Sequence, residues 1–207
     1  MSAVPRWKLT YFNSRGRAET IRLLFAQADV PYEDIRIDRT QWSALKEKTP
    51  FGQLPILEVD GKVLAQSRAI EKYLAKTFGL NGKTDWESAK IDELIQSMED
   101  LHNKLSPWFT EQDGVKKVEI FTRLFEEEIT PFLKRCEQFL IKNGTGYFVG
   151  DQLTLADLAL YDILSYFDEK LMPGHLHKYP KLAEFIEQVG NLPNIKAWVQ
   201  MRPKTGH

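Results

Sequence analysis

The sequence predicts a small α/β domain followed by an all-helical domain. The hydrophobic period changes every few residues over the first 80 positions, and an Asp-Gly pair there separates two β-prone runs. Beyond residue 85 the apolar spacing is helical almost throughout. The chain has 207 residues, of which 43% are hydrophobic and 28% charged, a composition typical of globular proteins. We therefore expect domains at 1–80 and 87–207, joined by a linker over 81–86.

The first domain begins with a short β-prone run. Residues 8–12 (KLTYF) predict a strand and residues 13–16 a turn. Residues 17–28 carry apolar side chains at helical spacing. Residues 32–37 (YEDIRI) alternate in polarity, which predicts a second strand, and residues 41–48 predict a short helix.

A hairpin and a third helix complete this domain. Asp60-Gly61 lies between residues 55–59 (PILEV) and 62–64 (KVL), which is the strongest short-range signal for a β-hairpin. Residues 67–78 place apolar side chains on one helical face. The predicted order is therefore β-α-β-α-β-β-α, which is typical of a small α/β domain with a mixed sheet.

The second domain is predicted to be a helical bundle. Helices are expected over residues 87–112 and 115–142, with a break near Thr130 because Pro131 lies inside the second pattern. Thr154 and Asp157 match a capping box before an apolar run, although the fourth position is usually Glu or Gln. Further helices are expected at 179–189 and 194–201.

Charge and cysteine content narrow the class of protein. The net charge of −1 lacks the basic excess of a nucleic-acid partner, and no apolar run reaches the roughly 18 residues of a membrane span. Cys136 is the only cysteine, which excludes an intramolecular disulfide. Residues 1–8 lack the apolar core of a signal peptide. We therefore expect a cytoplasmic protein that contacts neither nucleic acid nor a membrane.

A metal site is not expected. His175 and His177 form an H-x-H pair, but no third ligand lies at a recognisable spacing. Two histidines of a surface loop are the simpler interpretation of this pair.

Three segments together carry a resemblance to a known family: residues 9–19 (LTYFNSRGRAE), 49–61 (TPFGQLPILEVDG) and 64–70 (LAQSRAI). They resemble the N-terminal domain of sigma-class glutathione transferases, which include glutathione-dependent prostaglandin D synthases and invertebrate relatives. Residues 149–157 (VGDQLTLAD) and Arg202-Pro203 resemble the family's C-terminal domain. The resemblance covers essentially the whole chain. It implies a thioredoxin-like N-terminal domain, an all-helical C-terminal domain and a homodimeric detoxifying enzyme that uses glutathione as co-substrate without a metal.

The reaction requires a thiolate. A free thiol has a pKa near about 8.5, so only a few per cent is ionised at neutral pH. A hydrogen bond donated to the thiolate lowers this pKa, and a tyrosine hydroxyl is a suitable donor. By resemblance, Tyr11 is the catalytic tyrosine, and the Arg17 cation lies near the sulfur. From the residues alone, an aromatic strand residue of a core is the better interpretation of Tyr11, and the resemblance reverses that preference.

The resemblance also implies how the rest of glutathione is held. Leu54-Pro55 resembles a cis-proline step that presents the Leu54 backbone to the cysteinyl part. The γ-glutamyl carboxylate would meet the start of a helix, which Ser67 can cap. Trp42 and Lys46, four residues apart on one helix, resemble the residues that hold the glycine end. The implied glutathione-binding set is Tyr11, Arg17, Trp42, Lys46, Gly52, Gln53, Leu54, Pro55, Gln66, Ser67 and, from the partner subunit, Asp100.

The pocket for the second substrate is implied at Phe12, Ser14 and Trp108. Its substrates would be small hydrophobic electrophiles. Ser14 and His102 replace bulkier apolar residues of the vertebrate prostaglandin synthases, and the segment before Trp108 is about one residue longer. These departures argue against prostaglandin isomerase activity but do not affect the glutathione half of the site. Peroxide reduction or prostaglandin isomerisation could use the same thiolate.

A second class of function stays open. Some members of the family are lens crystallins, and others carry hydrophobic ligands without turnover. The presence of Tyr11, Arg17, Trp42, Gln53 and Gln66 together favours the enzyme.

Overall fold

The structure is a computed structural model, and it describes residues 5–205. It divides into two compact units: unit 1, residues 5–81 with 190–205, and unit 2, residues 82–189. Residues 190–205, which we expected in the helical domain, thus group with unit 1. Our expectations for residues 1–4 and 206–207 lie outside the described residues. No helix among the described residues is long and apolar enough to cross a membrane.

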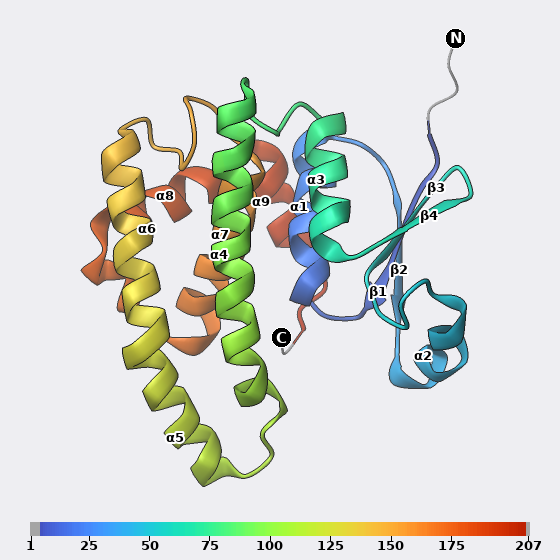
Figure 1. The fold of residues 1–207 in the computed structure, drawn as a ribbon, viewed down its shortest axis with the longest axis horizontal. Helices are drawn as coiled ribbons and strands as arrows, with labels where there is room; N and C mark the ends of the chain where they lie inside the picture. The colour runs from blue at the N-terminus through green and yellow to red at the C-terminus, as the bar shows by residue number, and fades with distance from the viewer. Residues whose placement is uncertain (1–4, 206–207) are drawn as a thin grey trace. The chain divides into compact units, whose positions relative to one another are not determined.

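A four-stranded mixed sheet forms the middle of unit 1 (Figure 1). Its strands are β1 (Trp7–Phe12), β2 (Glu33–Ile37), β3 (Ile56–Val59) and β4 (Lys62–Ala65). They are ordered β2-β1-β3-β4, with β1 parallel to β2 and antiparallel to β3. Asp60 and Gly61 form the hairpin turn with φ angles of 49° and 83°, a region that glycine adopts at little cost. The predicted element order is confirmed.

Four helices accompany this sheet. They are α1 (Glu19–Ala28), α2 (Arg39–Leu45), α3 (Ser67–Thr77) and α9 (Pro193–Met201). Helices α1 and α3 lie side by side on one face of the sheet, α2 lies on the opposite side, and α9 packs against α1 (Figure 1). Helix α1 begins two residues later than predicted because residues 16–18 form a 3₁₀ turn. Helix α2 begins earlier than predicted because Asp38 caps it: the Asp38 carboxylate accepts a hydrogen bond from the Gln41 N–H at 2.8 Å.

Apolar side chains between the sheet and its helices form the core of unit 1. Leu9 and Leu57 from the sheet and Ile21, Leu24 and Leu74 from the helices are fully buried. Burial of each such side chain contributes roughly 1.5–3 kcal/mol to stability. This core fixes α1 against the sheet and therefore fixes the segment that joins β1 to α1.

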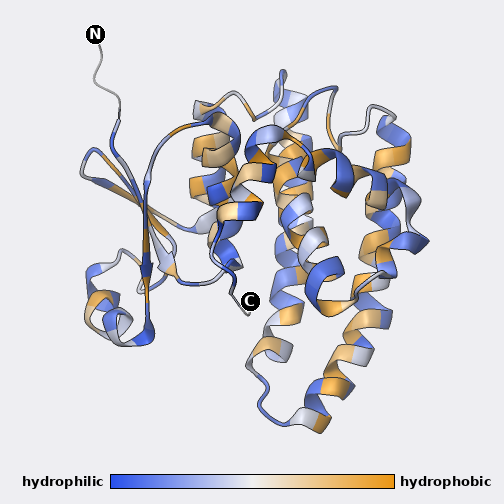
Figure 2. Ribbon diagram, turned by 180° about the vertical axis from the view of Figure 1, so that it is seen from behind, coloured by the Kyte–Doolittle hydropathy of each residue, from blue (hydrophilic) through white to orange (hydrophobic). Residues whose placement is uncertain are grey.

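Unit 2 consists of helices, each marked by recurring hydrophobic bands (Figure 2). Its α-helices are α4 (Asp85–Thr110), α5 (Gly114–Leu124), α6 (Thr130–Asn143), α7 (Leu155–Tyr166) and α8 (Pro180–Gly190). The long pattern at 115–142 is interrupted by a π-helical turn at Phe125–Ile129, and Pro131 lies in the first turn of α6, where its missing N–H is tolerated. The predicted break near Thr130 is confirmed.

The capping box of α7 forms as predicted, with aspartate in the place of glutamate. The Asp157 carboxylate accepts from the Thr154 N–H at 2.7 Å and the Thr154 hydroxyl at 2.8 Å. Its other oxygen accepts from the Phe148 N–H at 2.8 Å. Asp157 is fully buried, so these three donors replace the water that it loses. The box therefore ties the loop before α7 to the start of the helix.

We expect Asp157→Ala to lower the free energy of unfolding by about 2 kcal/mol, because it removes a helix cap and leaves buried donors unpaired. Asp85→Ala, at an exposed first-turn position of α4, is the matched control and should cost less than about 0.5 kcal/mol. Urea unfolding measures both. An equal effect of the two substitutions would contradict the role of the box.

The same carboxyl predicts a pH dependence. Burial raises the pKa of Asp157 to about 6, above the value of an unfolded aspartate. The protonated carboxyl therefore contributes to the free energy of unfolding at low pH. This contribution is lost as the pH rises from about 4 to about 6. The stability difference between the wild type and Asp157→Ala should narrow over that interval.

Candidate active site

The sheet brings three of the predicted site residues to one edge. The β1–β3 register pairs Thr10 with Ile56, and the β3–β4 register pairs Ile56 with Ala65. Residues 11, 55 and 66 are each one position beyond these pairs: Tyr11 is the next residue of β1, Pro55 directly precedes β3 and Gln66 directly follows β4. Continuing the register predicts that these three positions are neighbours although they are far apart in sequence. The Leu54–Pro55 peptide bond is cis, as the resemblance implies.

The Tyr11 hydroxyl is held by the backbone that follows it. The side chain is 9% exposed, and its Oη accepts a hydrogen bond from the Arg17 N–H at 3.1 Å. A hydroxyl can accept one hydrogen bond and donate another, so the Tyr11 hydrogen is available for a ligand. The close approach depends on Gly16, where φ is 41° and an added Cβ would lie 2.6 Å from Tyr11 Oη.

The environment keeps this hydroxyl protonated. Burial raises the pKa of Tyr11 above its ordinary value, and the Arg17 N–H and the charges of Arg17 and Arg22 offset the rise only in part. The ordinary value is already about 10, so Tyr11 is a hydrogen-bond donor at neutral pH.

Gln66 and Gln53 are joined at the start of α3. The Gln66 Nε2 donates to Gln53 Oε1 at 3.1 Å. Gln66 is the residue before the helix and has a φ of 74°, which is rare for a residue with a side chain. Ser67, which we expected to cap α3, is instead its first residue, and no side chain caps the helix. The first N–H groups of α3 therefore point to the sheet edge without a capping side chain, which suits a carboxylate.

Aromatic contacts connect Tyr11 to the second helix. Phe12 packs against Tyr11 and against Trp42 of α2, with ring centroids at 5.6 Å and 5.8 Å. Lys46 follows α2, and its side chain lies over Gly52, where an added Cβ would be 3.6 Å from Lys46 Cε. Phe12 thus connects Tyr11 to Trp42, and Lys46 adjoins the Gly52 loop; that the two residues share one ligand with Tyr11 stays a prediction.

Sequence analysis missed a buried cluster behind Tyr11. The Arg22 side chain is fully buried, and its Nη1 donates to the Ser14 carbonyl at 2.8 Å and to Glu19 Oε2 at 3.2 Å. Its Nε lies 3.2 Å from Asp34 Oδ2. The i, i+3 spacing of Glu19 and Arg22 on a helix was the available signal. That spacing is usual for exposed pairs, so it gave no hint of burial.

The remaining predicted residues belong to unit 2 or to the electrophile pocket. Trp108 of α4 contacts Phe121 at 5.3 Å between ring centroids, and the Lys117 ammonium lies 5.2 Å from its ring. Asp100 is an exposed residue of α4. Phe12 and Ser14 lie in unit 1, so the pocket that these residues would share with Trp108 stays a prediction.

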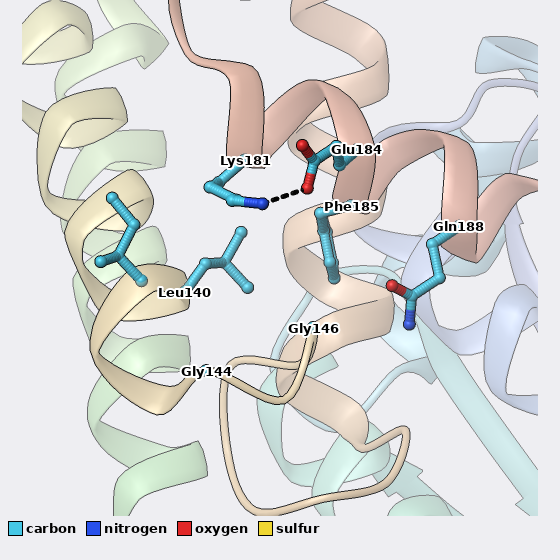
Figure 3. Close-up of a pocket in the computed structure, with 8 residues that line it drawn as sticks. Leu140, Gly144, Gly146, Lys181, Glu184, Phe185 and Gln188 are labelled. Carbon is cyan, nitrogen blue, oxygen red and sulfur yellow. Dashed lines mark hydrogen bonds and ion pairs between the residues drawn. The ribbon is translucent and has the colours of Figure 1, made fainter.

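Unit 2 contains a cavity of about 200 Å³ between α6 and α8 (Figure 3). It is lined by Leu140, Phe185 and Gln188, with an ion pair of Lys181 and Glu184 beside it. None of the predicted site residues lines it. Among residues 5–205, no group of three or more His, Cys, Asp or Glu side chains is placed to hold a metal ion.

Comparison with known proteins identifies the family of the chain. Residues 7–76 match the family described as Glutathione S-transferase, N-terminal domain, and residues 99–202 match Glutathione S-transferase, C-terminal domain. The chain is 46% identical to Glutathione S-transferase 1 of Ascaris suum over 98% of this chain and 99% of that protein. It is 40% identical to Hematopoietic prostaglandin D synthase of Mus musculus over 98% and 99% of the two chains.

A solved structure gives the same result for the fold. The crystal structure of monomeric Na-GST-3, a glutathione S-transferase of Necator americanus, superposes with a TM-score of 0.91 at 38% identity. The superposition covers 98% of this chain and 100% of that one. The chain therefore belongs to the glutathione S-transferase family, and the protein is a glutathione transferase. Its predicted fold, a thioredoxin-like domain followed by a helical domain, is confirmed.

We expect Gly16→Ala to lower kcat/KM for glutathione conjugation by about tenfold or more, because the new Cβ displaces the Tyr11 hydroxyl. Gly61→Ala is the matched control. Gly61 also has a positive φ, of 83°, but an added Cβ there meets nothing within 4 Å. Gly61→Ala should lower stability by about 1 kcal/mol in thermal unfolding, and Gly16→Ala by more, because its Cβ also collides with the Tyr11 side chain. Equal activity of the two variants would show that Gly16 does not control the hydroxyl.

Proposed function

We propose that this transferase binds glutathione along the edge of the sheet formed by residues 11, 55 and 66. The Tyr11 hydroxyl donates a hydrogen bond to the sulfur and stabilises it as thiolate. The observation that carries the proposal is the Arg17 N–H bond to Tyr11 Oη, because it occupies an acceptor position and leaves the hydroxyl hydrogen for the ligand.

The energetic requirement is modest. Lowering a thiol pKa by two units requires about 2.7 kcal/mol of preferential stabilisation of the thiolate. A single hydrogen bond to a charged group contributes about 1.5–3 kcal/mol. The partly exposed Arg17 cation adds to this stabilisation, because it also favours the charged sulfur.

The rest of the proposed ligand follows the same edge. The γ-glutamyl carboxylate meets the first N–H groups of α3 at Ser67, beside the Gln53–Gln66 pair. The Leu54 backbone pairs with the cysteinyl part like an added strand. Trp42 and Lys46 hold the glycine end, where the Lys46 ammonium faces a carboxylate.

The thiolate then attacks a small hydrophobic electrophile. With an aryl halide, a carbon–sulfur bond forms at the ring carbon and the halide leaves. We place this electrophile at Phe12, Ser14 and Trp108. Prostaglandin D isomerisation, which the name of the murine relative suggests, is a second proposed use of the same thiolate. Peroxide reduction is a third.

The proposal includes a cytoplasmic, sigma-class homodimer. Phe51, Val63 and Tyr73 of unit 1 are large apolar side chains with exposed fractions of 65%, 50% and 42%, and a subunit interface that covers them would support the proposal. Asp100 would reach the γ-glutamyl ammonium of the partner's ligand, so each complete site would need two chains. The hookworm relative described as monomeric makes this the first point to test.

We expect Tyr11→Phe to lower kcat/KM for conjugation to a chromogenic aryl halide by about tenfold or more, because it removes only the hydroxyl donor. The apparent pKa of the bound thiol, measured by thiolate absorbance, should rise. Tyr147→Phe, at a half-buried tyrosine of the loop before α7 and outside the proposed site and interface, is the control and should change neither quantity. If the wild type binds glutathione without turnover, a carrier or crystallin-like role replaces the enzyme.

Subunit complementation tests the role of Asp100. Tyr11→Phe and Asp100→Ala proteins, each of low activity, are mixed under conditions that exchange subunits. If Asp100 acts across the interface, each heterodimer regains one intact site, and activity should recover to about a quarter of wild type. If Asp100 acts within its own chain, every site stays defective and activity does not recover. Sedimentation of the wild type as a monomer would also exclude the proposal.

A further inference from the structure

A buried ionic network connects the last helix of unit 1 to the segment after Tyr11. Glu19, at the start of α1, is 1% exposed and lies at its centre. One carboxylate oxygen accepts from Arg22 Nη1 at 3.2 Å. The other accepts from Trp198 Nε1 and Arg202 Nη1, both at 2.9 Å. Trp198 lies in α9 and Arg202 directly follows it, so Glu19 joins α9 to Arg22.

Arg22 in turn holds the segment between Tyr11 and Arg17. Its Nη1 donates to the Ser14 carbonyl at 2.8 Å and to the Arg15 carbonyl at 3.4 Å. These carbonyls lie in the turn that ends with the Arg17 N–H bonded to Tyr11 Oη. The position of that N–H therefore depends on where the Arg22 guanidinium is held.

A second arm supports the same turn. Asp34 of β2 contacts Arg22 Nε at 3.2 Å and Arg36 Nε at 2.8 Å. Arg36 Nη1 donates to Asn13 Oδ1 at 3.2 Å. The turn thus connects to the charged network at three consecutive residues. Asn13 is reached through Arg36, and Ser14 and Arg15 are reached through Arg22.

We propose that Glu19, Arg22 and Arg202 are positioning residues for the transferase reaction, through which α9 holds the turn that orients the Tyr11 hydroxyl. This inference rests on the proposed function of Tyr11. The chemistry remains with Tyr11 and the thiolate, and the network acts through the Arg17 N–H.

The charge of Arg22 gives the network a second influence on Tyr11. The guanidinium carbon lies 5.9 Å from the centroid of the Tyr11 ring. Its positive charge, like that of Arg17, makes the hydroxyl a stronger hydrogen-bond donor. A guanidinium that loses the Glu19 carboxylate would shift or take up water, and both changes would weaken the donor.

The test uses three variants of the full-length protein that keep the shape of the network. Trp198→Phe removes one N–H donor and keeps an aromatic ring, Glu19→Gln removes the negative charge, and Arg202→Gln removes the distal cation. The matched control is Asn194→Ala. Asn194 Nδ2 donates to the Gln27 carbonyl at 3.3 Å, so it also joins α9 to α1, through a hydrogen bond to a residue outside the network.

The readouts are the pH profile of kcat/KM for conjugation and the thiolate absorbance of bound glutathione. We expect the three variants to raise the apparent thiol pKa by about half a unit or more, with kcat/KM about threefold lower below that pKa and converging with the wild type above it. Asn194→Ala should leave the profile unchanged. Glu19→Gln removes the carboxylate that compensates buried cationic charge, and this loss can prevent folding. If the Glu19→Gln protein does not fold, Trp198→Phe decides the test.

Two results distinguish failure of this inference from failure of the proposed role of Tyr11. If the variants lower the melting temperature but leave the thiol pKa unchanged, while Tyr11→Phe raises it, the network is only structural and the inference is wrong. If Tyr11→Phe itself leaves the thiol pKa unchanged, the proposed role of Tyr11 fails first.

Discussion

The burial of one guanidinium governs the geometry around Tyr11. Arg22 is 0% exposed, and a charge in that position is tolerated only where hydrogen bonds and opposite charges replace its water. Glu19, Asp34 and the Ser14 carbonyl supply them, from a helix, a strand and a turn respectively. Each of these elements must therefore keep its place for the others to remain stable. The segment that presents an N–H to Tyr11 is consequently tied to the buried Arg22 side chain through the Ser14 and Arg15 carbonyls.

The pKa of Glu19 reflects the charges and hydrogen bonds that surround this buried carboxyl. Burial alone would raise the pKa of this carboxyl, but the charges of Arg22 and Arg202, with hydrogen bonds from Trp198 and Arg202, hold it below its ordinary value. Glu19 is therefore ionised at neutral pH. Because its folded pKa is lowered, its contribution to stability is present above the pKa of an unfolded glutamate and is lost as the pH falls through the folded pKa. Acid should thus loosen the turn together with α9.

Local signals predicted most elements of the fold. The Asp60-Gly61 turn, the helical spacing after Ser67 and the Thr154–Asp157 box each depend on neighbours within a few residues, which a single sequence displays directly. The same holds for the break before Pro131. The start of α1 was predicted two residues early, because the 3₁₀ turn at Gly16–Ala18 is stabilised by Tyr11 and Arg22 rather than by its own sequence.

The site could be predicted only in part, for a physical reason. The resemblance named the residues, but the juxtaposition of residues 11, 55 and 66 depends on strand register, which alternation alone does not determine. The Glu19–Trp198 bond spans 179 residues of sequence, and no local pattern predicts such a contact.

The glutathione part and the electrophile part of the proposed site differ in how their residues are held in place. The residues proposed to hold glutathione, apart from Asp100, lie in unit 1 on a scaffold that extends from the sheet through α1 to α9. Their positions relative to one another follow from strand register and from buried polar contacts. The residues proposed for the electrophile are divided between the turn at Ser14 and the aromatic cluster around Trp108. The nucleophile half of the proposed mechanism therefore depends on unit 1 alone, whereas the proposed electrophile pocket also requires Trp108 of unit 2.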